Sequence, residues 1–235
     1  MRKTALWSAA VLATTLTFVP TAPCFARSLQ KDVDQAAVII ERFRNMPEQG
    51  IPDAVLRDAK GLAILTRLKA GFVFSGEGGA GLVVARTPRG WSAPSAIGTG
   101  GAGFGFQIGA EVSEIVLVLN TPEAVNAFAH RANVKLGGDL SVAAGPVGRN
   151  LAAAVMPVAA VYTYSRSQGL FAGISLDGAV IATRTDANAN YYGRRVTAAE
   201  ILSGRVKRPP GSERLLVALD RADRVRSRAY AATRR

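Results

Sequence analysis

The sequence predicts an α+β fold in which a strongly curved, barrel-like antiparallel β-sheet is flanked by N- and C-terminal helices. Short apolar or alternating runs, separated by Gly-rich and Pro-Arg-Gly turns, fill the middle of the chain. Apolar residues recur at helical spacing near both ends. Glycine occupies every second position from Gly101 to Gly105. This spacing removes side chains from one strand face and favours a bent or closed sheet.

The first 26 residues have the pattern of an export signal. Two positive charges at the start precede an apolar run over residues 5–19, which is short for a membrane span, and small residues lead up to Ala26. We expect cleavage after Ala26 and an exported protein in the periplasm or cell envelope. Lipoprotein anchoring at Cys24, the only cysteine, is the alternative, and Pro23 before it argues against that. A mature chain without a thiol would exclude disulfides and zinc–thiolate sites.

An amphipathic helix is expected over Leu29–Met46, and a short second helix over Asp53–Lys60. The first helix could lie on a membrane, since buried apolar area and basic residues near anionic head groups both stabilise such contact. The side chains expected to enter the leaflet are Leu29, Val33, Ile40 and Phe43, with Lys31, Arg42 and Arg44 as the basic residues. The alternative is that the same face packs on the sheet.

The strands predicted before residue 120 are Leu62–Arg67, Gly71–Phe74, Leu82–Arg86, Ser95–Gly98, Gly103–Ala110 and Glu114–Leu119. Those predicted after it are Leu140–Ala144, Val155–Tyr164, Leu170–Leu176 and Ala179–Thr183. Asp177-Gly178 favours a hairpin between the last two. Helices are expected from Pro122, with Thr121 as N-cap, to about Arg131, over Thr197–Leu202, and from Ser212 onward.

Two hexapeptides, at Gly76–Gly81 and Gly98–Gly103, fit the G-x-G-x-x-G spacing of dinucleotide-binding loops. A dinucleotide loop must open a helix, because the helix N-terminus holds the pyrophosphate. The residues after both hexapeptides alternate at the strand period instead. We therefore predict neither nucleotide binding nor any other cofactor.

Catalytic and metal-binding patterns are missing from the sequence. His130, the only histidine, lies at a predicted helix end, without carboxylates at metal-ligand spacing. Residues 186–190 begin like a calcium loop but continue with Tyr191 where glycine is required, so we expect a turn there. No acid/base pair or activated nucleophile can be named, and we predict that the protein is not an enzyme.

The net charge of +12 is concentrated in the C-terminal tail. Residues 27–193 contain 15 basic and 13 acidic side chains, whereas residues 194–235 contain 12 and 4. Nucleic acid is excluded as a partner if the protein is exported, which leaves anionic phospholipid; the alternative is a solvated, partly disordered terminus. On the last predicted helix, Arg214, Arg221, Arg224 and Arg228 form a basic stripe that suits an anionic leaflet.

Five segments, AGFVFSGEGGAGLVVAR, GWSAPSAIGTGGAGFGFQIGAE, LSVAAGPVGR, YSRSQGLFAGISLDG and NYYG, are similar in order and spacing to the SYLF domain family. The similarity covers Ser28–Lys207 and indicates a domain over residues 27–207 with a basic tail over 208–235. It implies a lipid-binding module, since eukaryotic members bind phosphoinositides partly through an N-terminal amphipathic helix, and some bind actin. Actin is an unexpected partner for an exported protein.

We therefore expect a non-catalytic domain that binds anionic phospholipid through the first helix and basic surface residues. Trp91, Tyr164 and Arg166 lie in the family-like segments and could line a lipid pocket, although core packing is the more ordinary role for such residues. The competing hypothesis is a structural or protein-interaction module of the cell envelope. The sequence indicates no oligomeric state.

Overall fold

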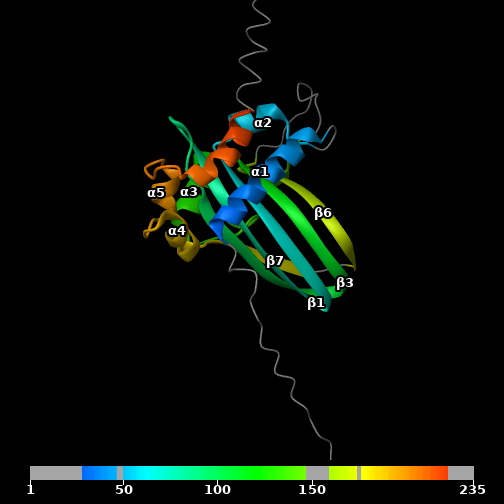
Figure 1. Ribbon diagram of the computed structural model, residues 1–235. Coiled ribbons are helices and arrows are strands. Elements are labelled where there is room, and N and C mark those ends of the chain that lie inside the picture. Colours follow the sequence, from blue (N-terminus) through cyan, green and yellow to red (C-terminus); the bar gives the residue numbers. More distant parts are fainter. Residues whose placement is uncertain (1–27, 47–49, 147–158, 174–175, 222–235) are drawn as a thin grey trace, which may run out of the picture.

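The computed structural model describes residues 28–46, 50–146, 159–173 and 176–221. It confirms the predicted α+β class: Figure 1 shows a curved sheet with its helices gathered at one end, while the strands continue past them toward the lower right. The predicted export signal, Cys24, Arg224 and Arg228 lie outside the described residues.

The helices form where capping residues and apolar periodicity predict them, with one addition. The helix α1 begins after Ser28, whose hydroxyl accepts a hydrogen bond from the Lys31 amide, and α3 begins after Thr121, which caps Ala124 in the same way. The bounds are α1 Leu29–Asn45, α2 Asp53–Asp58, α3 Pro122–His130, α4 Thr185–Tyr192 and α5 Ala198–Leu202, with a 3₁₀ turn η2 over Pro210–Ser212 and helical residues 213–221.

Helix α4 corrects the turn predicted over residues 186–190. Its Asn188 is fully buried, accepts a hydrogen bond from the Ala96 amide at 2.7 Å, and donates one to the Ser95 hydroxyl at 3.2 Å. The helix ends at Gly193, in the left-handed region at φ 67°. Periodicity does not predict α4, because the helix is only weakly amphipathic. A buried amide, and not a continuous apolar stripe, is its fully buried contact with the sheet.

Two very long strands replace the six short ones predicted before residue 120. Strand β1 runs over Gly61–Thr87 and β3 over Ser95–Leu119, and they pair antiparallel along nearly their full lengths. Within this ladder the two Gly-rich hexapeptides lie opposite each other, with Gly78 facing Gly100. Neither hexapeptide is a turn, and neither opens a helix.

The glycines allow the two ends of β1 to touch. A Cβ atom on Gly81 would lie 2.1 Å from the carbonyl oxygen of Ile64 and 2.6 Å from the Cα of Leu65, which no side chain tolerates. Nearby, the Arg86 amide donates to the Lys60 carbonyl at 2.8 Å. The predicted strong curvature therefore takes the form of a strand whose end returns to its own beginning.

Strands β6 (Val161–Gly173) and β7 (Leu176–Thr183) lie one after the other along β3. The hairpin predicted at Asp177-Gly178 is wrong, because both residues belong to β7 and pair with β3, where Asp177 lies opposite Gly103. The sheet is completed by β2 (Gly90–Trp91) beside β1, β4 (Asn133–Val134) beside β7 and β5 (Val142–Ala144), which is parallel to β6.

The sheet has an apolar core on each face at the helical end. One core contains Leu62, Ile64 and the alternate residues of the neighbouring strands, packed against α1 and the helical residues 213–221. The other contains Ala63 and Leu65, packed against α3. Successive strand residues thus serve opposite cores. Residues 82–85 of β1 belong to the same two cores, so among the described residues it is the middle of each long strand, about 67–79 of β1 and 98–113 of β3, that lies outside both cores.

Candidate membrane-contact surfaces

The apolar face of α1 packs on the sheet. Leu29, Val33, Ile40 and Phe43 are each 0–1% exposed and belong to the core that α1 shares with β1, β3 and residues 213–221. The structure thus shows the packing alternative; lipid contact by these four side chains stays a prediction and would require α1 to leave the sheet. The sheet already provides the apolar surface that the amphipathic pattern requires.

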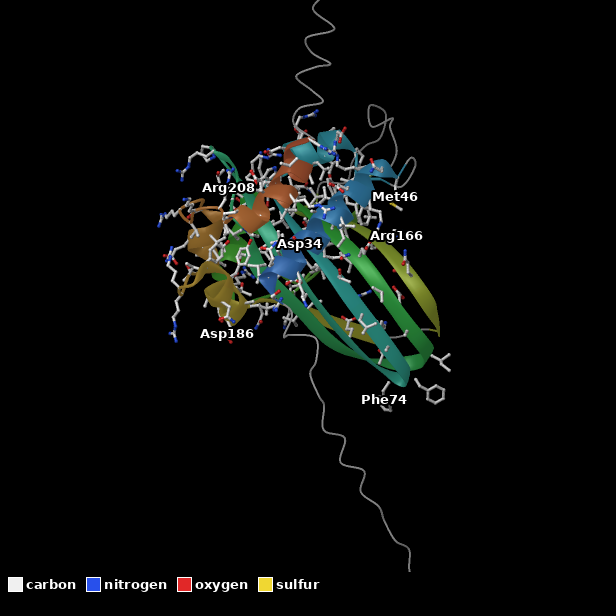
Figure 2. All side chains as sticks on the ribbon, viewed as in Figure 1. Asp34, Met46, Phe74, Arg166, Asp186 and Arg208 are labelled. Atoms are coloured by element: carbon white, nitrogen blue, oxygen red, sulfur yellow. The ribbon has the colours of Figure 1, made fainter. Side chains whose placement is uncertain are left out.

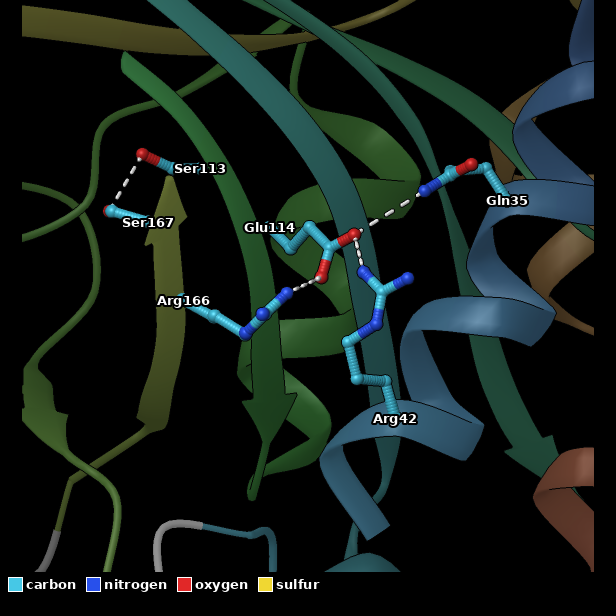
Figure 3. A network of polar contacts seen from close by, with 6 residues as sticks. All are labelled: Gln35, Arg42, Ser113, Glu114, Arg166 and Ser167. Atoms are coloured by element: carbon cyan, nitrogen blue, oxygen red, sulfur yellow. Dashed lines mark hydrogen bonds and ion pairs between the residues drawn. The ribbon is translucent and has the colours of Figure 1, made fainter. Parts of the chain in front are cut away.

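Arg42 and Arg44 of α1 form ion pairs with acidic residues of neighbouring elements. Figure 3 shows the Arg42 guanidinium on Glu114 of β3, which also accepts a hydrogen bond from the Gln35 amide at 3.5 Å and lies 3.8 Å from Arg166. Arg44 contacts Asp53 at 3.2 Å and donates to the carbonyl of Ala218 at 3.4 Å. Lys31 is exposed. Arg42 and Arg44 therefore hold α1 in place rather than pointing unpaired toward solvent.

A third ion pair fastens the first turn of α1. Asp32 lies 2.8 Å from the guanidinium of Arg184, the residue between β7 and α4, and both side chains are deeply buried, at 1% and 9% exposed. Charges removed from water this far are stable only when they are paired. The helix is thus tied to the sheet by apolar packing and by buried electrostatics.

The basic stripe predicted on the last helix is only partly described. Arg214 is exposed and lies 3.9 Å from Glu41 of α1, and Arg221 is exposed at the end of the described residues. On the opposite side of the same helix, Leu215 and Leu219 are buried against α1. The terminal helix therefore packs on the domain while its arginines face outward.

Trp91, Tyr164 and Arg166 do not come together in a pocket. Trp91 is 1% exposed and lies under the guanidinium of Arg86, 4.2 Å from the ring centroid. Tyr164 is 3% exposed and donates to the carbonyl of Pro146 at 2.9 Å; burial raises the pKa of its hydroxyl above the ordinary value. Arg166 lies near Glu114. Tyr164 packs in the core, as the alternative role predicts, whereas Trp91 also lines a surface cleft.

The structure reveals an exposed apolar surface that the sequence interpretation missed. Five large side chains from β1 and β3 are 43–71% exposed near the Phe72–Phe74 irregularity of the ladder. These residues, called the apolar tip below, are Leu68, Phe72, Phe74, Ile108 and Val112. Leu68 lies opposite Val112, and Phe72 lies opposite Ile108, so these four share one face of the sheet. Figure 2 shows Phe74 at the lower right extremity of the sheet, away from the helices.

The carboxylates near the apolar tip are engaged. Glu77 pairs with Arg67 at 3.2 Å, and its side chain is only 2% exposed. Glu111 accepts a hydrogen bond from Ser113 at 2.7 Å. Hydrogen bonds from Ser167 and Ser113, with the charges of Arg67 and Lys69, hold the pKa of Glu111 below its ordinary value, so it is ionised at neutral pH. The tip therefore ends in apolar groups, with its nearest charges balanced behind it.

Periodicity contained a signal for the tip that needed strand pairing to be understood. Leu68, Phe72 and Phe74 alternate with smaller or polar residues, as do Ile108 and Val112, and each run alone resembles a half-buried strand. Only the register shows that the runs face each other in the middle of the ladder, at its bend and outside both cores.

The described residues contain neither a membrane-spanning helix nor a metal-binding cluster. Among the helices there, none combines the length and apolar composition that a membrane crossing needs. The same part of the chain contains no cluster of three or more histidine, cysteine, aspartate or glutamate residues able to hold a metal ion.

Comparison with known proteins gives one consistent result. A family model described as "Ysc84: Las17-binding protein actin regulator" matches residues 100–222. Protein YSC84 of Saccharomyces cerevisiae is 46% identical over 218 residues, covering 88% of this chain and 45% of that protein. SH3 domain-containing YSC84-like protein 1 of Homo sapiens is 48% identical over 201 residues, covering 82% of this chain and 59% of that protein. The chain spans about half the length of these relatives.

Proposed function

Because the chain belongs to the Ysc84 family of SYLF-domain proteins, we propose that it is a non-catalytic module that binds phospholipid membranes, and that the apolar tip enters the leaflet. One observation supports this proposal above the others: five large apolar side chains are gathered, exposed, at the projecting bend in the middle of β1 and β3. Monomeric proteins seldom expose such clusters unless another apolar phase covers them.

The shape and charge of the tip favour a leaflet as that phase. The tip projects from the molecule, so it suits insertion into a soft layer better than enclosure of a ligand. Burying one large apolar side chain contributes about 1.5–3 kcal/mol, and partial insertion of several would give measurable binding. Among the carboxylates behind the tip whose side chains the structure describes, Glu77 is paired with Arg67 and Glu111 accepts a hydrogen bond from Ser113, which limits repulsion from an anionic surface.

The test is sedimentation with anionic and with neutral vesicles at several salt concentrations. Phe72→Thr with Ile108→Thr removes two facing tip residues, while threonine preserves strand propensity. We expect a ten- to hundredfold loss of affinity, in line with about 1.4 kcal/mol for each factor of ten. The loss should persist at high salt, because screening weakens charge contacts but not apolar ones.

A matched control is Val142→Thr, which alters an exposed apolar strand residue on β5 away from the tip. It should bind vesicles like the unmodified chain. Equal, negligible binding of the unmodified chain to both kinds of vesicle would refute the proposal, as would unaltered binding by the tip variant.

A protein partner is the second candidate function, favoured by the family description, which names Las17 binding and actin regulation. On this hypothesis the apolar tip enters a hydrophobic pocket of a protein, in the envelope if the chain is exported. Cross-linking in lipid-free extract would then recover one protein with the unmodified chain and lose it with the tip variant. Recovery by both chains would mean that another surface makes the contact.

Export is part of the proposal and depends on the pattern of residues 1–26 alone. Mass spectrometry of the protein from its native cells should find an N-terminus at Arg27. A chain that retains Met1, or one lipidated at Cys24, would replace this hypothesis.

A further inference from the structure

We propose that a second surface, a basic cleft far from the apolar tip, binds a phosphate-bearing anion. The basic cleft lies between the β1–β2 turn and residues 204–208, has a volume of about 580 Å³, and has Arg89, Arg205, Lys207 and Arg208 among its lining residues. Figure 2 shows Arg208 at the opposite end of the molecule from Phe74. The inference does not depend on membrane insertion by the tip.

The four cations of the basic cleft are not neutralised. All four are exposed, and across the described residues none forms an ion pair with a carboxylate. No acidic residue from the described part of the chain lines the cleft. Glu200 of α5 feels the charge of Arg205, which helps to lower its pKa, but its carboxylate accepts hydrogen bonds from the amide and hydroxyl of Thr197. Four like charges held together favour an anion of more than one negative charge.

Arginine–carbonyl hydrogen bonds fix the two walls of the cleft relative to each other. Arg89 donates to the Gly204 carbonyl at 2.7 Å, and Arg208 donates to the Arg89 carbonyl at 2.6 Å. Gly90 and Gly204 have φ of 94° and 76°, which most other residues avoid, so glycine maintains the shape of both walls. A guanidinium has five N–H donors, and one bond to a carbonyl leaves others for an anion. The cations are therefore positioned before a ligand arrives, which reduces the entropy lost on binding.

Trp91 provides an independent sign that an acceptor is missing. It lines the cleft and is 1% exposed, and its indole Nε1–H has no hydrogen-bond acceptor within the described part of the chain. Buried donors are nearly always satisfied, because an unsatisfied one keeps the cost of its lost hydration. Because Trp91 lines the cleft, an oxyanion bound there would lie against the residue that carries this donor.

Phosphate esters fit this chemistry better than carboxylates. Arginine forms paired N–H···O bonds to phosphate oxygens, and three of the four cations are arginines. The volume suits a head group or a small phosphate ester and is too small for a whole phospholipid. A lipid head group and a soluble phosphate ester share this chemistry, so the experiment separates the two sources.

The test titrates pyrophosphate into the full chain by calorimetry. The double variant Arg205→Gln with Lys207→Gln removes two cleft charges and leaves the two arginine–carbonyl bonds intact. The control, Arg214→Gln with Arg221→Gln, removes the same charge from the last helix. We expect at least a tenfold loss of affinity in the cleft variant and less than a twofold loss in the control. Absence of saturable binding by the unmodified chain, or equal losses in both variants, would overturn the proposal.

The NMR signal of the Trp91 indole N–H gives a second test of where the anion binds. With Trp7→Phe as background, the remaining indole N–H signal belongs to Trp91 and should shift as pyrophosphate saturates the protein. A signal that stays in place while pyrophosphate binds would put the anion elsewhere and overturn the assignment to this cleft.

Vesicles then identify the source of the phosphate. If the cleft variant loses binding to anionic vesicles but keeps binding to neutral ones, the ligand is a lipid head group; unchanged vesicle binding indicates a soluble ester. Either result supports phosphate binding. The tip variant, Phe72→Thr with Ile108→Thr, should bind pyrophosphate normally, so failure of the cleft and failure of the tip are distinguishable.

Discussion

Two apolar surfaces of this molecule differ in solvent exposure: one is buried and the other is exposed. The apolar face of α1 is 0–1% exposed at Leu29, Val33, Ile40 and Phe43, whereas the apolar tip of β1 and β3 is 43–71% exposed. In the sequence, the helix has the stronger membrane-like pattern and the tip resembles ordinary half-buried strands. The difference shows that an apolar pattern predicts that a surface will be buried, but does not say against what. The neighbouring elements of the fold decide whether that surface packs inside the protein or stays exposed.

The largest effect is expected where α1 is fastened by buried charge. Asp32→Ala leaves the guanidinium of Arg184 buried without this carboxylate and should cost about 3–5 kcal/mol of the free energy of unfolding. Denaturant unfolding measures it. The control is Asp34→Ala, since this residue is exposed on the same helix and its loss should cost less than about 0.5 kcal/mol. Similar costs for both would mean that the buried pair does not hold the helix.

The same substitution in the two surfaces should give opposite results. Ile40→Ala empties part of a core and should lower the free energy of unfolding by about 2–5 kcal/mol, with vesicle affinity of the folded protein unchanged. Ile108→Ala in the tip should change stability by less than about 0.5 kcal/mol and weaken vesicle binding severalfold. Unfolding curves and sedimentation together test the pair. If Ile40→Ala weakened vesicle binding of the folded protein, α1 would have to leave the sheet at the membrane.

The cap of α1 provides a smaller test of how firmly the helix is held. Ser28→Ala removes the hydroxyl that accepts from the Lys31 amide and should cost about 0.5–2 kcal/mol. Ser28→Asp keeps an acceptor at the cap and should recover most of the loss in thermal unfolding. Tip-dependent vesicle binding should be the same in both variants, and a change in it would connect the two surfaces.

The smallest effect concerns the hydrogen-bonded carboxylate behind the tip. The pKa of Glu111 is lowered in the folded protein, first by Ser167 and then by Ser113, so its stabilising contribution is present above the ordinary value of 4.5. That contribution is lost as the pH falls through the lower folded value. Ser167→Ala should therefore reduce the melting temperature slightly at pH 7 and less at pH 3. Ser165→Ala, on the same strand, should show no such pH dependence.

The α+β class, the curvature and most helices could be predicted from sequence because local signals determine them. Thr121 before Pro122 and the amphipathic run after Ser28 each determine a helix by capping and spacing alone. The alternate glycines from Gly101 to Gly105 predict close backbone approach, and the structure shows such an approach at Gly81 of the neighbouring strand, where a Cβ atom would meet the Ile64 carbonyl. The export signal stays a prediction.

The features that could not be predicted from the sequence depend on pairing between residues that are far apart in the chain. Asp177-Gly178 favours a hairpin locally, but both residues pair with β3 instead. The Gly-rich hexapeptides resemble turns in sequence, yet they are paired strand residues in the structure. Arg42 and Arg44 were expected to meet lipid, but their acidic partners lie on β3 and α2, which sequence spacing does not place beside α1. Basic residues are concentrated after residue 194, as the sequence shows. Some of them, from Arg205 to Arg208, line a cleft that sequence alone does not predict, because its other wall contains the distant residue Arg89.

The single interruption in the β1–β3 ladder limits how the length of this hairpin can change. Register is continuous from Gly61 to Phe72 and again from Phe74 to Val83. Deleting or inserting one residue within either stretch would exchange inward and outward faces for every position beyond it, burying charge and exposing core. Homologues are therefore expected to gain or lose residues at the bend, or by two at a time in both strands within the continuous stretches.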